Sequence, residues 1–416
     1  MQTTAPVGNH VTAPHVDVRF SKSPDGGSGD AVSVALVAVA GVICDSEVYM
    51  NRNALLSVPM VCLAALAFAQ APGIALPPGA SPQAPQDPGY QALIATCKTP
   101  PPARSGGPGG ARGGAPQGGG PAAAAAPATF PPPPAEYTVT EIPGVIAAGQ
   151  KWTKVWEVSG NNADGILADK NGDLLIAQNH NSAVVKLEKS SRVSTVYKDT
   201  HTGGALSQNK KGALFIVERG LRQNVSQLAP QRRVLADKLP NGDPLDCLGG
   251  VINDLTTDSN GGVYFTMGGL FYSDPKGIVT RYGENLATNG VVLSQDEKTL
   301  YVTNGRTVAA FDVQPDGSLK NQRQFGELPS GNGDGMTIDA QRRLYVTAGP
   351  AVHVVAPDGK LLGTIPAPYG LITAAFAGKD KRTLYAVVSL IDPMRLQHAY
   401  VYSIPMSAQG YEGRAK

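Results

Sequence analysis

The sequence has few of the residues on which several classes of site depend. Its 416 residues include four cysteines (Cys44, Cys62, Cys97 and Cys247), with no Cys-x-x-Cys pair. Zinc fingers, iron–sulfur clusters and c-type haem attachment are therefore excluded. Charged residues make up only 16% of the chain, the formal net charge is +2, and no run of Lys or Arg exceeds a few residues. Without clustered basic charge, neither nucleic acid nor an anionic membrane surface is expected as a partner.

Long apolar runs are also absent, and none reaches the 18 residues that a permanent membrane span needs. A shorter run follows Met50 (MNRNALLSVPMVCLAALAFAQA), with Arg52 before the apolar stretch and alanines at 67 and 69. This order predicts a secretory signal peptide over 50–70, with Met50 as the start and residues 1–49 as a disordered upstream extension. Two alternatives are that the apolar run at 31–44 is the anchor, or that both runs are disordered.

Export would place the protein in the periplasm or outside the cell, where Cys97 and Cys247 could pair. Between residues 98 and 135, Gly, Pro and Ala fill 30 of the 38 positions. Such a composition cannot bury enough apolar surface to offset chain ordering, so we predict a disordered linker over 71–136 with no chemistry. The remaining residues, 137–416, are long enough for one large domain.

A short apolar segment rich in β-branched and aromatic residues recurs six times in this region. Its copies begin at Leu174, Leu214, Val263, Leu300, Leu344 and Leu384. Each follows a polar turn and another short apolar strand, and most precede a third strand. This repetition at a period near 40 residues is typical of four-stranded propeller blades. The sequence therefore predicts an all-β, six-bladed β-propeller over 137–416, with a strand from 137–156 closing the ring against the last blade.

One position, ten or eleven residues before each repeated segment, opens the first strand of each blade. The residues at this position are Asp164, Gly204, Asn253, Asn289, Asp334 and Thr373. Because first strands line the central channel, these residues should converge on one ring. Two carboxylates and two amide oxygens suit one hard divalent cation, calcium foremost, with zinc or manganese as alternatives. The alternative interpretation is that the Asp-Gly and Asn-Gly pairs merely shape turns into these strands.

Several segments resemble the gluconolactonase / senescence marker protein / luciferin-regenerating enzyme superfamily. They are 253–266 (NDL…SNGGVYFT), 288–304 (TNGVVLSQDEKTLYVTN), 333–339 (GDGMTID) and 375–385 (AFAGKDKRTLY). The resemblance covers about 161 to 388. It implies a six-bladed propeller with a divalent metal at the channel mouth, and many members hydrolyse lactones.

The resemblance also implies roles for ring residues. Asn289 and Asp334 would be metal ligands, and Asn253 would be a ligand or a substrate contact. Asp164 stands where the family has a metal-binding Glu, and its side chain is one methylene shorter. No side chain is available at Gly204, which leaves His201 as the nearby polar residue of blade two.

These observations lead to the hypothesis of a metal-dependent lactonase, expected as a monomer. A cation would polarise the lactone carbonyl and activate water. Asp334 would both ligate the metal and handle the proton of the attacking water, while Asn253, Asp254 and His201 would contact the substrate. Two alternatives are a non-catalytic exported binding propeller and a related metal-dependent propeller hydrolase with another ester substrate.

Overall fold

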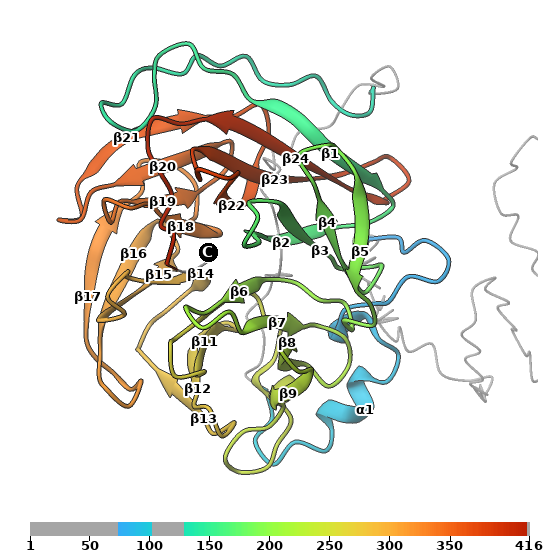
Figure 1. Cartoon of the computed structure of the whole chain (residues 1–416). Helices are drawn as coiled ribbons and strands as arrows, with labels where there is room; N and C mark the ends of the chain where they lie inside the picture. Colours follow the sequence, from blue (N-terminus) through green and yellow to red (C-terminus); the bar gives the residue numbers. More distant parts are fainter. Residues whose placement is uncertain (1–73, 102–128, 414–416) are drawn as a thin grey trace, which may run out of the picture. The chain divides into compact units, whose positions relative to one another are not determined.

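The computed structural model describes residues 74–101 and 129–413. Within these residues, 24 strands form six four-stranded antiparallel sheets arranged around a central axis (Figure 1). The prediction of an all-β, six-bladed β-propeller is confirmed. The predicted upstream extension (1–49) and signal peptide (50–70) lie outside the described residues, as do 71–73 and 102–128 of the predicted linker. In the described part, no helix has the length and apolar character needed to cross a membrane.

The strands of blades one to five follow the chain from the channel outward (Figure 1). Blade one contains β2 (Ala163–Ala168), β3 (Leu174–Gln178), β4 (Ala183–Leu187) and β5 (Val193–Tyr197). Blade two contains β6 (Leu206–Gln208), β7 (Leu214–Glu218), β8 (Asn224–Ala229) and β9 (Arg233–Ala236). Blade three contains β10 (Leu255–Thr257), β11 (Val263–Thr266), β12 (Leu270–Ser273) and β13 (Val279–Tyr282). Blade four contains β14 (Thr288–Leu293), β15 (Thr299–Asn304), β16 (Thr307–Val313) and β17 (Leu319–Glu327). Blade five contains β18 (Met336–Ile338), β19 (Leu344–Thr347), β20 (Ala351–Val355) and β21 (Leu361–Pro366).

Blade six joins the two ends of the domain in one sheet. Its strands are β22 (Leu371–Ala377), β23 (Thr383–Ile391), β24 (Gln397–Pro405) and β1 (Thr153–Ser159). The outermost strand, β1, pairs antiparallel with β24, for example Val158 with Ala399. A strand from before the first blade therefore closes the ring against the last one, as the sequence predicts.

The repeated apolar segments form the second strand of each blade. In β3, β7, β11 and β19 every residue is buried, because neighbouring blades cover both faces of these strands. One core cluster, for example, joins Phe215 and Val217 of blade two to Leu255 and Phe265 of blade three. Burial on both faces explains why these strands are continuously apolar instead of alternating.

The C-terminal residues cover the turns between first and second strands, on the face opposite the ring. Ala340 N donates to Gln409 O at 2.8 Å, and Lys381 Nζ donates to Tyr411 O at 2.9 Å. The Tyr411 hydroxyl donates to Gln295 O at 3.4 Å. These contacts connect blades four, five and six at this end of the domain.

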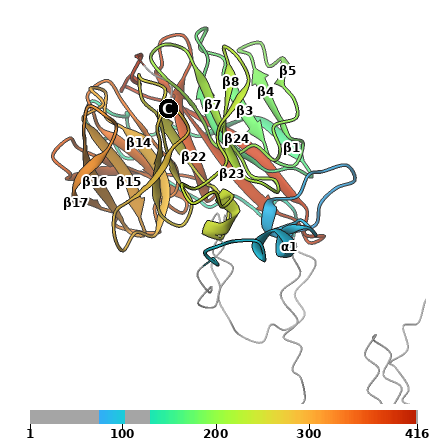
Figure 2. The ribbon, with the colours of Figure 1, turned by 90° about the horizontal axis from the view of Figure 1, so that it is seen from below.

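Residues 74–101, which we call the arm, lie on the other face of the propeller (Figure 2). The arm contains the 3-10 helix η1 (Ala84–Gln86) and the helix α1 (Tyr90–Ile94). Its Ser81 N donates to His180 O at 3.0 Å, and its Ala84 N donates to Arg219 O at 2.7 Å. The arm differs from the disordered linker predicted over 71–136, because Ala84, Tyr90 and Leu93 become buried when it packs on the domain.

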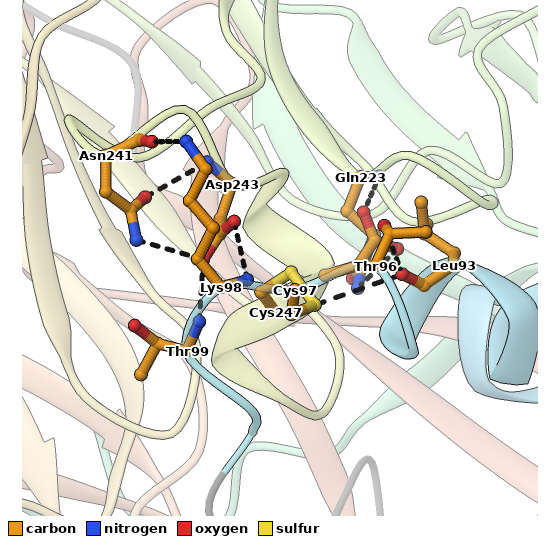
Figure 3. The surroundings of a disulfide bond; sticks show 10 residues. Leu93, Thr96, Cys97, Lys98, Thr99, Gln223, Asn241, Asp243 and Cys247 are labelled. Carbon is orange, nitrogen blue, oxygen red and sulfur yellow. Dashed lines mark hydrogen bonds between the residues drawn. A yellow bond between two sulfur atoms is a disulfide. The ribbon is translucent and has the colours of Figure 1, made fainter.

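A disulfide between Cys97 and Cys247 joins the arm to blade two across 150 residues of sequence (Figure 3). Cys247 lies in the 3-10 helix η2 (Leu245–Leu248), after the last strand of that blade. Beside the disulfide, Asp243 accepts hydrogen bonds from the backbone N–H groups of Lys98 and Thr99, at 3.0 and 3.1 Å. The pairing that the sequence leaves open is therefore present and supported by neighbouring contacts.

Candidate functional site

The ring residues line one small cavity in the channel. Five of the six predicted positions contribute to it, together with Asp254. The lining residues with polar side chains are Asp164, Asn253, Asp254, Asn289, Asp334 and Thr373. The cavity has a volume of about 10 Å³, which is about the size of one water molecule. One water molecule or one small ion would therefore fill it.

A β-bulge places the ring residues of blades one, four and five in the channel. In blades one and four the strand register shifts at Asp164-Gly165 and at Asn289-Gly290. In blade five, Asp334 N donates to Thr347 O at 2.7 Å, and Thr347 N donates to Gly335 O at 3.0 Å. Thr347 of the second strand thus pairs with both Asp334 and Gly335, which precede the first strand. Such an extra residue re-aims its side chain, here toward the axis.

A glycine follows three of the ring residues, Asp164, Asn289 and Asp334, and the close approach of the next blade requires it. A Cβ on Gly165 would lie 2.6 Å from backbone atoms of blade two. A Cβ on Gly290 would lie 2.2 Å from Asp334 O, and one on Gly335 would lie 2.2 Å from Thr373 Oγ1. No side chain fits at these distances. These dipeptides thus lie where inner strands of adjacent blades meet, so their glycines have a packing role as well as a place in the bulge.

Hydrogen bonds connect the amides of blades three and four. Asn253 Nδ2 donates to Asn289 Oδ1 at 2.8 Å. The carboxylate of Asp254 accepts from the backbone N–H groups of Leu255 and Val291, at 2.8 and 2.9 Å. Asp254 thus holds the first strands of these two blades together while it borders the cavity.

Arg219, which the sequence analysis did not single out, brings a guanidinium into the ring. It follows β7 directly and is 1% exposed. Its Nη1 donates to Asp164 Oδ2, and its Nε donates to Ile252 O at 2.8 Å. Its Nη2 donates to Asn253 O and lies 3.3 Å from Asn253 Oδ1. Arg219 therefore links the ring residues of blades one and three.

The space for this guanidinium comes from Gly204, the ring position of blade two. A Cβ on Gly204 would lie 2.2 Å from Arg219 Cζ. The available sequence signal is the pair itself: a glycine at the ring position and an arginine directly after the second strand of the same blade.

His201 lies near this arginine, but its side chain is exposed and does not line the cavity. Its backbone is left-handed, with φ of 44°. The His201 carbonyl accepts hydrogen bonds from Arg219 N at 3.0 Å and from Gly220 N at 2.8 Å. Its contribution to the site is thus made by the backbone.

Buried polar groups beside Asp164 extend the site into blade one. In the amide orientation that satisfies its hydrogen bonds, Asn179 donates to Asn162 O at 3.1 Å and accepts from Arg219 Nη1 at 3.0 Å. Among the described residues, four buried polar atoms of this blade have no partner: Asn161 Nδ2, Asn162 Oδ1, His180 Nδ1 and Thr200 Oγ1. Burial lowers the pKa of the His180 imidazole, so this side chain is neutral near pH 7.

Three acidic side chains, Asp164, Asp254 and Asp334, border the cavity. Burial raises the pKa of the Asp334 carboxyl well above its ordinary value, and the charges of Asp164 and Asp254 add to the rise. The Arg219 charge and a hydrogen bond from Asn289 oppose it. Three carboxylates thus face one guanidinium, whose ion pair is with Asp164.

These residues fit a divalent cation. Across the parts of the chain that the structure describes, no three His, Cys, Asp or Glu side chains form a metal cluster by themselves. The cavity instead offers a mixed set of oxygen donors, from Asp164, Asn253, Asn289 and Asp334. Carboxylate and amide oxygens are ligands of hard cations, and the cavity has the space of one ion.

The fold and the site define a class: six-bladed β-propellers with an oxygen-lined polar site in the channel. Within this class, residues 149–389 match the SMP-30/Gluconolactonase/LRE-like region. This match covers more than half of the chain, which therefore belongs to that family.

Curated relatives include lactone-hydrolysing enzymes. The gluconolactonase of Zymomonas mobilis subsp. mobilis is 25% identical over 287 residues, which are 59% of this chain and 78% of that protein. Lactonase drp35 of Staphylococcus saprophyticus is 29% identical over 194 residues, which are 42% of this chain and 58% of that protein.

Solved structures show the same fold. The gluconolactonase XC5397 of Xanthomonas campestris matches with a TM-score of 0.54 at 21% identity, over 69% of this chain and 98% of that one. A luciferin-regenerating enzyme matches with a TM-score of 0.52 at 18% identity, over 64% of this chain and 98% of that one.

Proposed function

We propose that this protein is a metal-dependent hydrolase of a cyclic ester, a lactone. The observation that carries the proposal is the ion-sized cavity at which carboxylate and amide oxygens of four blades meet. The names of the relatives support the lactone as substrate class. Asn253, Asn289 and Asp334 would hold the cation, with Asp164 as a further ligand, and calcium is the ion that this donor set favours, ahead of zinc or manganese.

A divalent cation bound here would polarise the lactone carbonyl and lower the pKa of water. Asp334 accepts the proton of the attacking water as the water oxygen bonds to the carbonyl carbon. The ring C–O bond then breaks, and the departing ring oxygen takes that proton, which gives a hydroxy acid. Asn253 orients the carbonyl side of the ring, and Asp254 fixes Asn253 by holding the strand that follows it.

A non-catalytic binding propeller is the second candidate. The observation in its favour is that Asp164, which stands at the place of the family's Glu, already has a partner in Arg219. Such a protein would bind its ligand without needing Asp334. A hydrolase acting on another ester is the third candidate, and it would share the same cation site.

The test is a joint measurement of metal content and lactone hydrolysis on the whole mature chain. We expect one divalent ion per chain and turnover of at least one lactone from a panel of ring sizes. Asp334→Ala should lose the ion and reduce kcat/KM by at least about 100-fold, the usual scale for loss of a proton acceptor. Asp316→Ala, which removes an exposed aspartate from an outer turn, is the matched control and should change neither. Normal turnover in Asp334→Ala would contradict the mechanism.

We also propose that the protein is exported, to the periplasm or the cell exterior, and acts as a monomer. The disulfide between Cys97 and Cys247 supports export, because such bonds persist in oxidising compartments. Cell fractionation with N-terminal sequencing tests it, and a mature chain that begins just after residue 69 is the expected result. An intact N-terminus in the cytoplasm would contradict it.

A further inference from the structure

We propose that Arg219 is a positioning residue that competes with a divalent cation for Asp164. The carboxylate would then have two alternative partners, and the guanidinium would set how tightly the ring holds its ion. This inference rests on the proposed cation site and adds a determinant of its affinity. The consequence is that the natural protein holds its cation more weakly than its donor set alone would allow.

The position of Arg219 is fixed from both its backbone and its side chain. Its backbone N donates to His201 O at 3.0 Å, and its carbonyl accepts from Ala84 of the arm at 2.7 Å. Every nitrogen of its guanidinium donates to an oxygen of the protein, in Asp164, Ile252 or Asn253. With 1% exposure it has no face left for a substrate. Arg219 therefore acts through the groups that it holds.

Asp164 is the group that the guanidinium and a cation would share. Its side chain is 12% exposed, and it borders the cavity while Oδ2 bonds to Arg219 Nη1. An aspartate also reaches about 1–1.5 Å less far than the glutamate of the family pattern, given ordinary bond lengths. Turning fully toward a cation would therefore require Asp164 to give up at least part of its bond with Arg219.

The positive charge of the Arg219 guanidinium also weakens cation binding. The guanidinium also lies 3.3 Å from Asn253 Oδ1, so its positive charge stands beside two of the four oxygen donors. Like charges separated by a few ångströms in a buried site repel strongly. Gly204 has no side chain, so the guanidinium of Arg219 occupies the blade-two position of the ring.

The experiment titrates calcium, manganese and zinc separately into the purified mature chain by calorimetry. Arg219→Met removes the charge and keeps much of the side-chain stem. We expect it to bind the preferred cation about 10- to 100-fold more tightly, because a like charge a few ångströms from the ion is removed. Arg222→Met removes an exposed arginine three residues further along and should bind as the natural protein does. Arg219→Lys keeps the charge but loses the planar set of donors, so its affinity should lie between those of the natural protein and Arg219→Met.

A measurement on the natural protein guards against a variant that fails to fold. The side-chain ¹⁵N resonances of Arg219, assigned by their loss in Arg219→Lys, should shift as calcium or zinc saturates the site. Those of Arg222 should not. An unchanged Arg219 signal at saturation would overturn the competition.

The outcomes separate this inference from the proposed function. Tighter binding in Arg219→Met supports the inference whether or not a lactone is turned over. Equal or weaker binding in that variant overturns it and leaves a metal-dependent lactonase possible. If no form binds a cation, the inference is overturned, and lactone hydrolysis in the presence of a chelator then decides the function separately.

Discussion

Gly204 and Arg219 share one position of the channel ring, because the glycine leaves the space that the guanidinium fills. A Cβ on Gly204 would lie 2.2 Å from Arg219 Cζ and 2.3 Å from Arg219 Nε. The ring of this propeller thus combines side chains from the first strands with one that arrives from the end of a second strand.

Gly204→Ala should destabilise the protein, because a buried, fully bonded guanidinium would have to move. We expect the free energy of unfolding to fall by about 1–3 kcal/mol, as for other overpacked sites. Gly269→Ala is the control: the nearest atoms to its added Cβ would be at 3.4 Å, an ordinary contact distance. Urea unfolding of both variants checks this, and equal effects would show that the guanidinium is free to move aside.

Calcium should raise the melting temperature of the natural protein. At a free concentration of 100 times Kd, binding adds about 2.7 kcal/mol of stability. In a domain of this size that corresponds to a rise of about 4–5 °C. Differential scanning calorimetry measures it, a chelator should reverse it, and Asp334→Ala should remove it while Asp316→Ala keeps it. A rise that persists in Asp334→Ala would place the ion elsewhere.

The stability of the protein should depend on pH through His353. Its imidazole is buried in blade five, with Nδ1 2.9 Å from Thr364 Oγ1 and Nε2 3.1 Å from Ser330 O. Burial lowers its pKa from the ordinary value of 6.5. Below that pH the His353 imidazole binds a proton in the unfolded chain but not in the folded protein. The free energy of unfolding therefore decreases as the pH falls below about 6.5.

The size of this effect is at most about 1.4 kcal/mol per pH unit for one group. Urea unfolding at pH 7.5 and 5.5 measures it. His353→Gln should lower stability at both values but reduce the difference between them. An unchanged difference would mean that other groups carry the acid sensitivity.

Loss of the disulfide should release the arm and leave the propeller closed. In the double variant Cys97→Ser, Cys247→Ser, we expect a loss of about 2–4 kcal/mol in the stability of the arm's attachment. Hydrogen exchange should increase at the amides of Ala84 and Lys98, which bond to the propeller. The pairing of β1 with β24 does not involve the arm, so exchange there should stay slow. Equal protection of the arm with and without the disulfide would contradict this.

The sequence by itself determines the propeller and the register of its channel. Each blade repeats the same buried second strand, and the bulge that carries a ring residue lies at a nearly constant distance before it. Counting back from Leu174 or Leu344 therefore reaches Asp164 or Asp334, and these residues do line one cavity. A periodic architecture makes such counting possible, because equivalent positions in sequence become equivalent positions around one axis.

Only the tertiary structure decides what happens between blades and over their ends. Arg219 bonds to Asp164 across 55 residues of sequence, and Cys97 bonds to Cys247 across 150. The sequence leaves the cysteine pair open, and no repeat or fixed spacing predicts the contact of Arg219 with Asp164. The arm likewise has the composition of a linker and becomes ordered only where the propeller offers it buried contacts. Local periodicity fixes the elements, whereas a long side chain or a non-repeating segment is placed by whatever surface the assembled blades present to it.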